Sequence, residues 1–399
     1  MLTAMDNPSL MVTAPLKIAF YVTGHGFGHA TRAHVTIRRL LSLGHHVTIT
    51  SSVPTFIFSD LLCLHPKTCE LREVGTLDPG VVQRDAVTVD VEVTMERLSA
   101  FLDGMDAVAR KEVEWLTSQA FDVVCLDAPF LPARVAKEAR IPSILITNFT
   151  FDAIFAAIAE TPSDHALVER CAALYADADY LIRLPGHIPI PSFPAPSPEY
   201  TLDVPLIVRM AQQPRAVVRA ALGIPLDVKC VLITFGGFEL GNAGDAHAIE
   251  DVLPPGWCGL VGGQTDDRGV LGDRLRRIRT EKHHMPDLIH AADVVVGKCG
   301  YGTCSEVVAH GVPLVYVPRS GFAEEVGLVD NLMSMHGYAV QMPQGDFYAG
   351  RWQNYILKAE ALKGTKTPRP IANNGEIAAA NFVVSVGARQ RQAGAIGAE

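Results

Sequence analysis

Apolar runs of strand length alternate with helix-length amphipathic stretches along the chain. Residues 16–23 and 46–51 are apolar runs, and residues 30–43 between them have helical spacing and end at Gly44. This succession predicts a βαβ unit. The same criteria predict strands at 122–126, 143–147, 230–235, 293–297 and 313–318, and helices at 131–139, 215–222, 287–292, 303–310 and 374–386. The alternation predicts an α/β fold with doubly wound parallel sheets.

A chain of 399 residues is too long for one ordinary core, which predicts two domains. Residues 185–198 are the most proline-dense segment and lie near the midpoint. Because proline cannot donate a ladder hydrogen bond, this segment predicts an extended connection. We therefore expect a first domain at 1–195, a second at 196–375, and a C-terminal helix and tail at 376–399, frayed from 387. Residues 71–93 are expected to form either two short strands or a long loop over a cleft between the two domains.

Hydrophobic residues make up 48% of the chain and charged residues 19%, so it can bury a large core. The formal net charge of −9 argues against a general binder of nucleic acid or anionic membranes. Residues 1–17 do not have the pattern of a signal peptide, and no apolar run is long enough to span a membrane. These features predict a cytoplasmic protein without a membrane span.

Several chemical signatures are absent from the sequence. The eight cysteines contain no CxxC pair and no zinc spacing, so we interpret them as buried, reduced thiols. No GxxxxGK[ST] loop and no GxSxG elbow occur. His29 stands where a dinucleotide-binding motif has a small residue, and no acidic residue closes the strand near position 50, so NAD binding is not expected. We expect no cofactor and no metal.

Two glycine-rich segments, residues 21–29 and 297–306, each follow an apolar run and lead into a predicted helix. Such a turn lets backbone N–H groups approach a phosphate at a helix N-terminus. One turn in each half predicts two facing domains that share one ligand cleft. Ligands of open α/β sheets bind beyond the carboxyl ends of the strands, and Asp127 also falls at such an end.

His29, at the expected start of the first helix, is the candidate general base. The positive end of a helix disfavours the imidazolium, which suits a base. The alternative is a histidine that caps or packs the turn. His25 is a candidate for the acceptor side of the cleft, and His34 one turn later is expected only to pack.

Lys298 follows a buried strand directly, where a phosphate would compensate its charge better than solvent. Gly300, Gly302 and Thr303 supply backbone and hydroxyl donors. Glu306 has two interpretations. It either complements the helix dipole from the first turn, or accepts two ribose hydroxyls. The pair Glu324 and Glu325 either lies in a solvated turn or holds sugar hydroxyls.

Residues 298–306 with 310–318 resemble the donor-binding signature of GT-B glycosyltransferases, of the branches that include MurG and the UDP-glycosyltransferases. The Gly24–His29 turn resembles the acceptor-side loop of MurG. More closely, the chain resembles the N-terminal glycosyltransferase-like region of plant L-arabinokinases. The matching stretches span nearly the whole chain, at 21–32, 147–152, 183–189, 235–237, 297–306, 324–325 and 374–379.

The resemblance implies a GT-B fold of two Rossmann-like domains, with a C-terminal helix that crosses back to the first. It implies a nucleotide-sugar donor, usually UDP-linked, bound mainly by the second domain. Glu306 would bind the ribose, residues 300–303 the diphosphate, and Glu324 and Glu325 the donor sugar. His29 matches the catalytic base. The remaining site residues are His25, Gly26, Gly28, Asp127 and Asn148 on the acceptor side, and Gly236, Gly237, His284, Met285 and Tyr301 on the donor side, where His284 or Met285 would contact uracil.

Two departures from the family pattern matter. Lys298 stands where many plant-type enzymes have histidine, and Glu324-Glu325 replaces the usual Asp-Gln, which leaves the donor sugar open. The galactokinase-like half of arabinokinase has no counterpart here, so no sugar-kinase activity is expected. The resulting hypothesis is a metal-independent transferase that moves a sugar from a UDP-sugar to an acceptor hydroxyl. The alternatives are a non-catalytic nucleotide-sugar-binding module and a UDP-sugar epimerase of GT-B-like fold. The sequence does not identify the acceptor.

Overall fold

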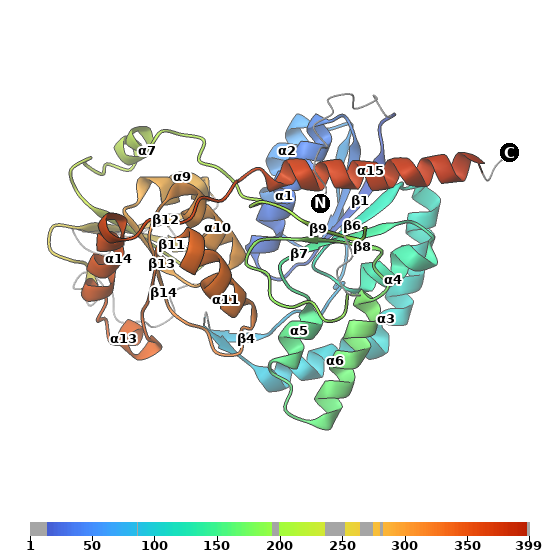
Figure 1. Cartoon of the computed structure of the whole chain (residues 1–399), viewed down its shortest axis with the longest axis horizontal. Coiled ribbons are helices and arrows are strands. Elements are labelled where there is room, and N and C mark those ends of the chain that lie inside the picture. The colour runs from blue at the N-terminus through green and yellow to red at the C-terminus, as the bar shows by residue number, and fades with distance from the viewer. Residues whose placement is uncertain are drawn as a thin grey trace.

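A computed structural model describes residues 14–85, 87–193, 199–235, 252–263, 274–279 and 282–396. These residues form two lobes, each built around a parallel sheet (Figure 1). The first sheet has the order β3 (Cys69–Glu73), β2 (His46–Ser51), β1 (Lys17–Val22), β6 (Val123–Asp127), β7 (Ser143–Thr147), β8 (Tyr180–Arg183) and β9 (Thr201–Asp203). The second has the order β12 (Leu275–Arg279), β11 (Cys258–Gly263), β10 (Cys230–Thr234), β13 (Val294–Gly297), β14 (Leu314–Tyr316) and β15 (Ala339–Gln341). The predicted α/β class is confirmed.

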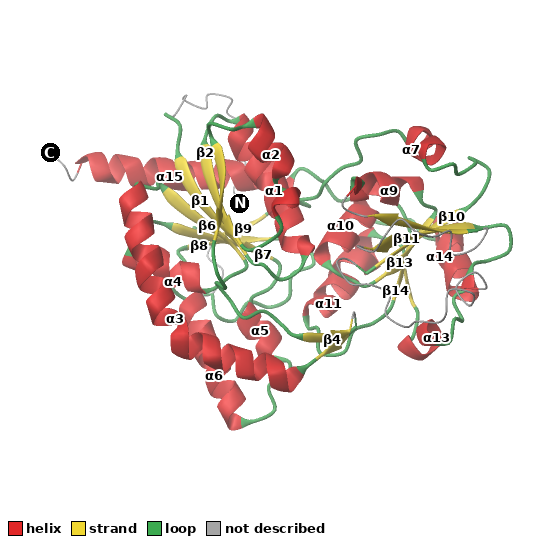
Figure 2. Cartoon of the chain, turned by 180° about the vertical axis from the view of Figure 1, so that it is seen from behind, coloured by secondary structure: helices red, strands yellow, loops and turns green. Residues whose placement is uncertain are grey.

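Helices surround both sheets (Figure 2). Those of the first lobe are α1 (Phe27–Ser42), α2 (Ser59–Leu64), α3 (Val91–Gln119), α4 (Leu131–Glu138), α5 (Phe151–Ala156) and α6 (Pro162–Tyr175), with the 3-10 turn η1 (Thr55–Ile57). Those that follow are α7 (Arg215–Ala221), α9 (Met285–Ala291), α10 (Tyr301–His310), α11 (Glu324–Gly327), the π-helical η4 (Leu328–Met333), α12 (Ser334–His336), α13 (Gln344–Tyr348), α14 (Gln353–Thr365) and α15 (Gly375–Ile396).

Strand β1 explains why the first sheet needs cover on both sides. Ile18 and Phe20 belong to one apolar cluster, with side chains of α1 and α15, whereas Ala19 and Tyr21 belong to another, with side chains of α3 and α4. Successive side chains of a strand point to opposite faces, so an unbroken apolar run is typical of a strand that is buried on both. This is why the apolar runs predicted the central strands well.

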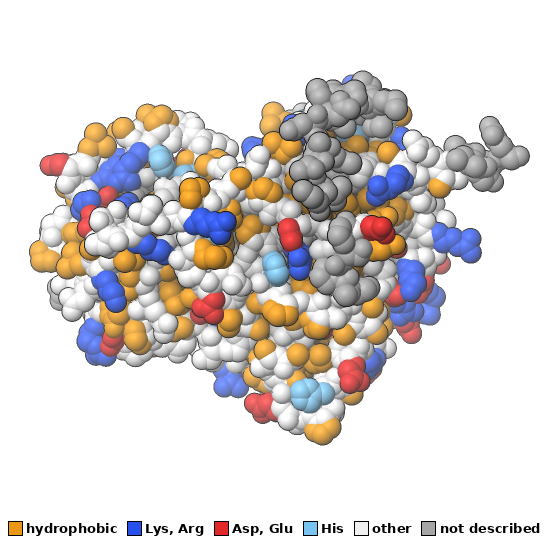
Figure 3. All heavy atoms as spheres, viewed as in Figure 1, with side chains coloured by type: hydrophobic (Ala, Val, Ile, Leu, Met, Phe, Trp, Pro, Cys, Tyr) orange, Lys and Arg blue, Asp and Glu red, His pale blue; other side chains and the backbone are white. Residues whose placement is uncertain are grey.

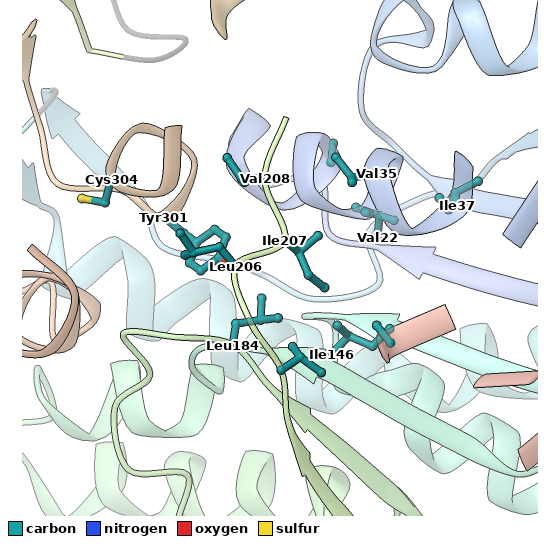
Figure 4. Close-up of a cluster of buried hydrophobic side chains, with 14 of the residues drawn as sticks. Val22, Val35, Ile37, Ile146, Leu184, Leu206, Ile207, Val208, Tyr301 and Cys304 are labelled. Atoms are coloured by element: carbon teal, nitrogen blue, oxygen red, sulfur yellow. The ribbon is translucent and has the colours of Figure 1, made fainter. Parts of the chain in front are cut away.

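The first of these clusters continues into the second lobe. It contains Tyr301 and Cys304 of α10 as well as Val22 and Val35 of β1 and α1. Figure 4 shows the segment 206–208, which follows β9, passing between Tyr301 and Val22. Part of the contact between the lobes is therefore apolar, and the returning chain belongs to this part.

Residues 71–93 contain the two short strands that were one of the two predicted possibilities. They are β4 (Gln83–Asp85) and β5 (Thr88–Val89), which pair as an antiparallel hairpin. Thr88 also bridges to Ser320, and the Ser320 N–H donates to the carbonyl of Val87 at 3.0 Å. A hairpin of the first lobe thus contacts the loop after β14 in the second.

Three of the predicted boundaries differ from the structure. Helices α1 and α10 begin at Phe27 and Tyr301, so each starts within its glycine turn, earlier than predicted. The predicted boundary at residue 195 falls before the last strand of the first sheet, because β9 pairs with β8. The proline-rich stretch that precedes β9 is described only through Phe193.

The predicted fraying from residue 387 is wrong, because α15 continues to Ile396. Arg391 anchors its end, since Nη2 donates to Asp122 Oδ2 at 2.6 Å and to the carbonyl of Pro15 at 2.7 Å. The helix crosses back over the first lobe (Figure 1), as predicted.

Of the helices in the described ranges, none has the length and apolarity needed to cross a membrane. Acidic and basic groups are interspersed on the face in Figure 3.

Candidate active site

The carboxyl ends of β1 and β6 bring His29 and Asp127 together. The register of these neighbouring strands pairs Val22 with Asp127. After β1 the chain turns at Gly26, whose φ of 80° favours glycine. The helix starts at Phe27, so His29 lies in its first turn. Its Nδ1 is 2.8 Å from Oδ1 of Asp127, with the two side chains 12% and 1% exposed.

Arg32 joins this pair and was not among the predicted site residues. It lies one helical turn after His29, on the same face of α1. Its Nε donates to Asp127 Oδ2 at 2.7 Å, and Nη2 donates to Oδ1 at 2.5 Å. Burial by itself raises the pKa of Asp127, but the Arg32 guanidinium and the bond with His29 bring this pKa below its ordinary value. Asp127 is therefore ionised at neutral pH.

The ionised Asp127 determines the tautomer of His29. A carboxylate only accepts hydrogen bonds, so the shared proton lies on Nδ1 of the imidazole. Nη2 of Arg32 is also 3.0 Å from this nitrogen, but it donates to the carboxylate because Nδ1 is itself a donor. In the neutral ring Nε2 then carries the lone pair, and it is the atom that can accept a proton.

The two glycine turns meet. A Cβ built on Gly302 would lie 3.6 Å from Cα of Gly28. The guanidinium carbon of Arg32 lies 4.9 Å from the centre of the Tyr301 ring, a cation–π contact between the lobes. The N-termini of α1 and α10, where backbone N–H groups lack intrahelical acceptors, therefore converge. Such a place favours anions.

Lys298 follows β13 directly and is half-buried. Burial, together with the nearby Arg319, lowers the pKa of its ammonium to about 7, against the opposing effect of Glu324 and Glu325. The lysine thus titrates near neutral pH, and a neighbouring anion would favour its charged form. Of the residues predicted beside it, Gly300 is the N-cap of α10 and Thr303 lies in the first turn.

Glu306 is the sixth residue of α10, because the helix begins at Tyr301. The interpretation that it complements the helix dipole from the first turn is therefore wrong. Its carboxylate is 4% exposed and pairs with Arg209, whose Nε and Nη2 lie 2.9 and 2.8 Å from Oε1. Arg209 follows β9 and was not predicted, since the segment carries no motif. This ion pair joins the returning chain to α10.

The acidic pair at the start of α11 is not a solvated turn. Glu325 is buried, and it accepts from the backbone N–H and from Nε of Arg319, both at 3.0 Å. Burial raises the pKa of Glu325 although Arg319 opposes the shift. Glu324 accepts from Nδ2 of Asn148 at 3.0 Å. A predicted acceptor-side residue and a predicted donor-side residue are thus in direct contact.

The other predicted residues lie around this centre. His25 interacts with Asp78, which the sequence reasoning missed. His284 is the N-cap of α9, next to Met285, and its Nε2 is 2.9 Å from the carbonyl of Met210. His34 binds Asp60 at 2.8 Å, away from the centre. Gly236 and Gly237 lie outside the described residues.

Comparison with known proteins bears on the family and the fold of this chain. Residues 278–374 match the model of the glycosyltransferase family 28 C-terminal domain. L-arabinokinase of Arabidopsis thaliana is 36% identical over 367 residues, which are 91% of this chain and 34% of the arabinokinase. The chain thus spans about a third of that relative.

Two solved structures illustrate the fold. The Arabidopsis thaliana protein UGT89C1, in its complex with UDP-L-rhamnose, has a TM-score of 0.57 and 16% identity, with 94% of this chain and 100% of that chain covered. Acinetobacter baumannii MurG has a TM-score of 0.51 and 16% identity, with 93% and 100% covered. The chain therefore has the GT-B fold of glycosyltransferases, and its residues 278–374 are similar to the glycosyltransferase family 28 C-terminal domain.

Proposed function

We propose that this chain transfers a glycosyl group from a UDP-sugar to an acceptor hydroxyl, without a metal ion, and that His29 is the general base. The observation that carries the proposal is the buried cluster of His29, Asp127 and Arg32 at the point where the two glycine turns meet. The structures of UGT89C1 with UDP-L-rhamnose and with UDP support UDP as the nucleotide.

In the proposed reaction, Nε2 of His29 takes the proton of the acceptor hydroxyl as its oxygen attacks the anomeric carbon. A new C–O bond forms, the C–O bond to UDP breaks, and UDP leaves with the bonding electrons. Asp127 stabilises the imidazolium that forms. Arg32 is a positioning residue, because it keeps Asp127 ionised and aimed at Nδ1.

The charge that develops on UDP would be stabilised by the convergent N-termini of α1 and α10 and by Lys298. Gly300, Gly302 and Thr303 would supply donors to the diphosphate. Glu306, held by Arg209, would accept the ribose hydroxyls. Glu324 and Glu325 would bind the donor sugar, and His284 or Met285 the base.

A binding-only module would need the donor residues but not the cluster around His29. Burying Arg32 and Asp127 costs free energy that only good geometry and further hydrogen bonds offset. Donor binding by itself does not require a histidine paired with Asp127, so this pair favours catalysis. An epimerase would change the donor without an acceptor. We do not propose for this chain the kinase activity that the name of the arabinokinase states.

The test is a thermal-shift screen against UDP, GDP, ADP and their common sugar conjugates. We expect UDP and at least one UDP-sugar to raise Tm by several degrees, since a ligand that binds only the folded state stabilises it. Glu306→Ala should lose this shift, and the matched exposed variant Glu169→Ala should keep it. If no nucleotide changes Tm, the proposed function is wrong. Product analysis without an acceptor distinguishes the epimerase.

A further inference from the structure

Two cysteines face each other across neighbouring strands of the second sheet. Strands β10 and β11 pair in parallel (Figure 2), and their register places Cys230 opposite Cys258. Both side chains lie on the same face of the sheet, because both contact the apolar cluster that contains Leu232 and Leu260. Neighbouring strands lie about 5 Å apart, which is within the range of Cα separations that a disulfide spans. The two thiols are therefore close enough to be joined.

The two thiols differ in exposure. Cys230 is buried, whereas Cys258 is half-buried. Each is the first residue of its strand, so the pair lies at the amino ends of β10 and β11. The residues of the candidate active site follow the carboxyl ends of strands, and the reaction proposed above uses neither thiol. A reagent from solvent thus reaches Cys258 before it reaches Cys230.

The surroundings of the pair favour a thiolate at Cys258. The hydrogen bond from Cys230 lowers the pKa of the Cys258 thiol to about 7, although burial opposes the shift, and the guanidinium groups of Arg219 and Arg276 assist it. The same hydrogen bond, together with burial, raises the pKa of Cys230 well above its ordinary value. Arg219 is itself held by Asp293, whose Oδ2 accepts from Nη1 at 3.3 Å. The pair thus combines a nucleophilic thiolate with a protonated thiol.

All eight cysteines lie in the part of the chain that the structure describes, and the other six differ from this pair. Cys63 is exposed at the end of α2, so the prediction that the thiols are buried is wrong there. Cys299 and Cys304 also share a thiol hydrogen bond, but both are fully buried. Burial raises the pKa of three further thiols, those of Cys69, Cys125 and Cys171. A buried thiol with a raised pKa is a weak nucleophile.

A hydroperoxide would react with the pair in two steps. The Cys258 thiolate attacks one peroxide oxygen, so that an S–O bond forms and the O–O bond breaks, and the departing oxygen takes a proton to become water or an alcohol. The Cys230 thiol then attacks the sulfur of the resulting sulfenic acid. An S–S bond forms, the S–O bond breaks, and the departing hydroxide takes the Cys230 proton and becomes water. The two thiols thus give two electrons to the peroxide.

We propose that Cys258 and Cys230 form a site of reversible modification, at which a hydroperoxide oxidises Cys258 and Cys230 then closes a disulfide between β10 and β11. A small dithiol reverses the modification by thiol–disulfide exchange. The inference does not rest on the proposed transferase function, since both thiols lie outside that site. It predicts that Cys258 reacts before Cys63, although Cys63 is the more exposed thiol.

The test treats the reduced full chain with hydrogen peroxide, alkylates the remaining thiols and maps the peptides by mass spectrometry. We expect a pair of peptides joined through Cys230 and Cys258, which dithiothreitol separates again. Cys63→Ser is the matched control, because it removes an exposed thiol outside the pair, and it should form the same disulfide at the wild-type rate. In Cys230→Ser no thiol resolves the intermediate, so the sulfenic acid of Cys258 should accumulate and be trapped by dimedone.

Cys258→Ser removes the attacking thiolate, and we expect oxidation of Cys230 to slow by about tenfold or more. Three results in the wild-type protein overturn the inference. They are oxidation confined to Cys63, a disulfide between any other two cysteines, and an unchanged Cys258 at a peroxide dose that oxidises free glutathione. Because the wild-type map decides the question alone, the answer does not depend on whether each variant folds.

Discussion

Asn148 in the first lobe donates a hydrogen bond from Nδ2 to Oε1 of Glu324 in the second lobe, at 3.0 Å. The Asn148 side chain cannot turn freely, because its Oδ1 accepts from Nη1 of Arg32 at 2.5 Å. One amide therefore connects the cluster around the proposed base with the loop proposed to hold the donor sugar. Contact between these two parts of the site requires the lobes to be close together.

Replacing Asn148 with alanine should weaken this connection. The variant removes the acceptor of Nη1 of buried Arg32 and the donor to Glu324, so we expect the free energy of unfolding to fall by about 1–3 kcal/mol. Transfer should fall at least tenfold, since both the base and the donor loop lose a contact. Denaturant titration and an initial-rate assay measure the two effects. The exposed Asn331→Ala should change neither, and a fully active Asn148→Ala would refute the connection.

Asp127→Asn tests the role of the carboxylate at constant shape. It removes the charge that stabilises the imidazolium, and we expect kcat to fall by about 10²–10⁴-fold. It also leaves Arg32 buried without its counter-ion, which costs about 3–5 kcal/mol of stability. The rate is therefore measured at low temperature, with near-ultraviolet circular dichroism to confirm folding. Asp203→Asn, on an exposed ion pair with Arg183, is the control. A folded Asp127→Asn with wild-type kcat would rule out this role.

UDP binding should depend on pH through Lys298. The pKa of this lysine is lowered to about 7 in the free protein, and a bound diphosphate would raise it. Below pH 7 the lysine is already charged, whereas above pH 7 binding requires proton uptake. We therefore expect UDP affinity to fall from pH 7 to pH 9, by up to tenfold per pH unit. Calorimetry in two buffers of different ionisation enthalpy should detect the proton.

The lysine also affects folding stability, with a definite sign. The unfolded chain binds this proton up to the ordinary pKa of lysine, so between about pH 7 and that value the unfolded state holds more protons. The contribution of Lys298 to stability therefore increases with pH in this window. Lys298→Arg, which stays charged, should abolish both pH dependences. If its pH profiles of UDP affinity and stability match the wild type, another group is responsible.

The end of α15 should contribute to stability and not to catalysis. Arg391→Ala removes two bonds to Asp122, an acceptor that is 9% exposed, and two to the backbone of residues 14 and 15. We expect the free energy of unfolding to fall by about 1–3 kcal/mol, with kcat at 10 °C unchanged. Gln392→Ala, one residue later and exposed, is the control. Equal Tm values for the two variants would show that the helix end is not anchored.

Much of this fold was predictable from apolar runs, because β1, β6 and β7 are buried on both faces and their sequences are therefore mostly apolar. The rule that ligands bind at strand ends also placed Asp127 and His29 in the same region. The helix starts were predicted too late, because glycine at positions 28 and 302 is unfavourable in helices and masks their first turns.

The charged partners could not be predicted in the same way. Arg209 lies in a segment without regular structure, and only the three-dimensional fold brings it to Glu306, 97 residues away. Asp78 follows an edge strand and likewise meets His25 only through the fold. Arg32 was accessible in principle, since a cation three residues after His29 shares its helix face. An isolated arginine in a helix, however, is usually exposed.

The most direct test of the account compares catalysis with donor binding in His29→Ala. Transfer is measured with the UDP-sugar that raises Tm most, and UDP affinity is measured by calorimetry on the same samples. The exposed His46→Ala serves as the control. We expect a loss of about 10²–10⁴-fold in kcat, with UDP affinity within about twofold of the wild type. Transfer at the wild-type rate by a folded His29→Ala protein would contradict it.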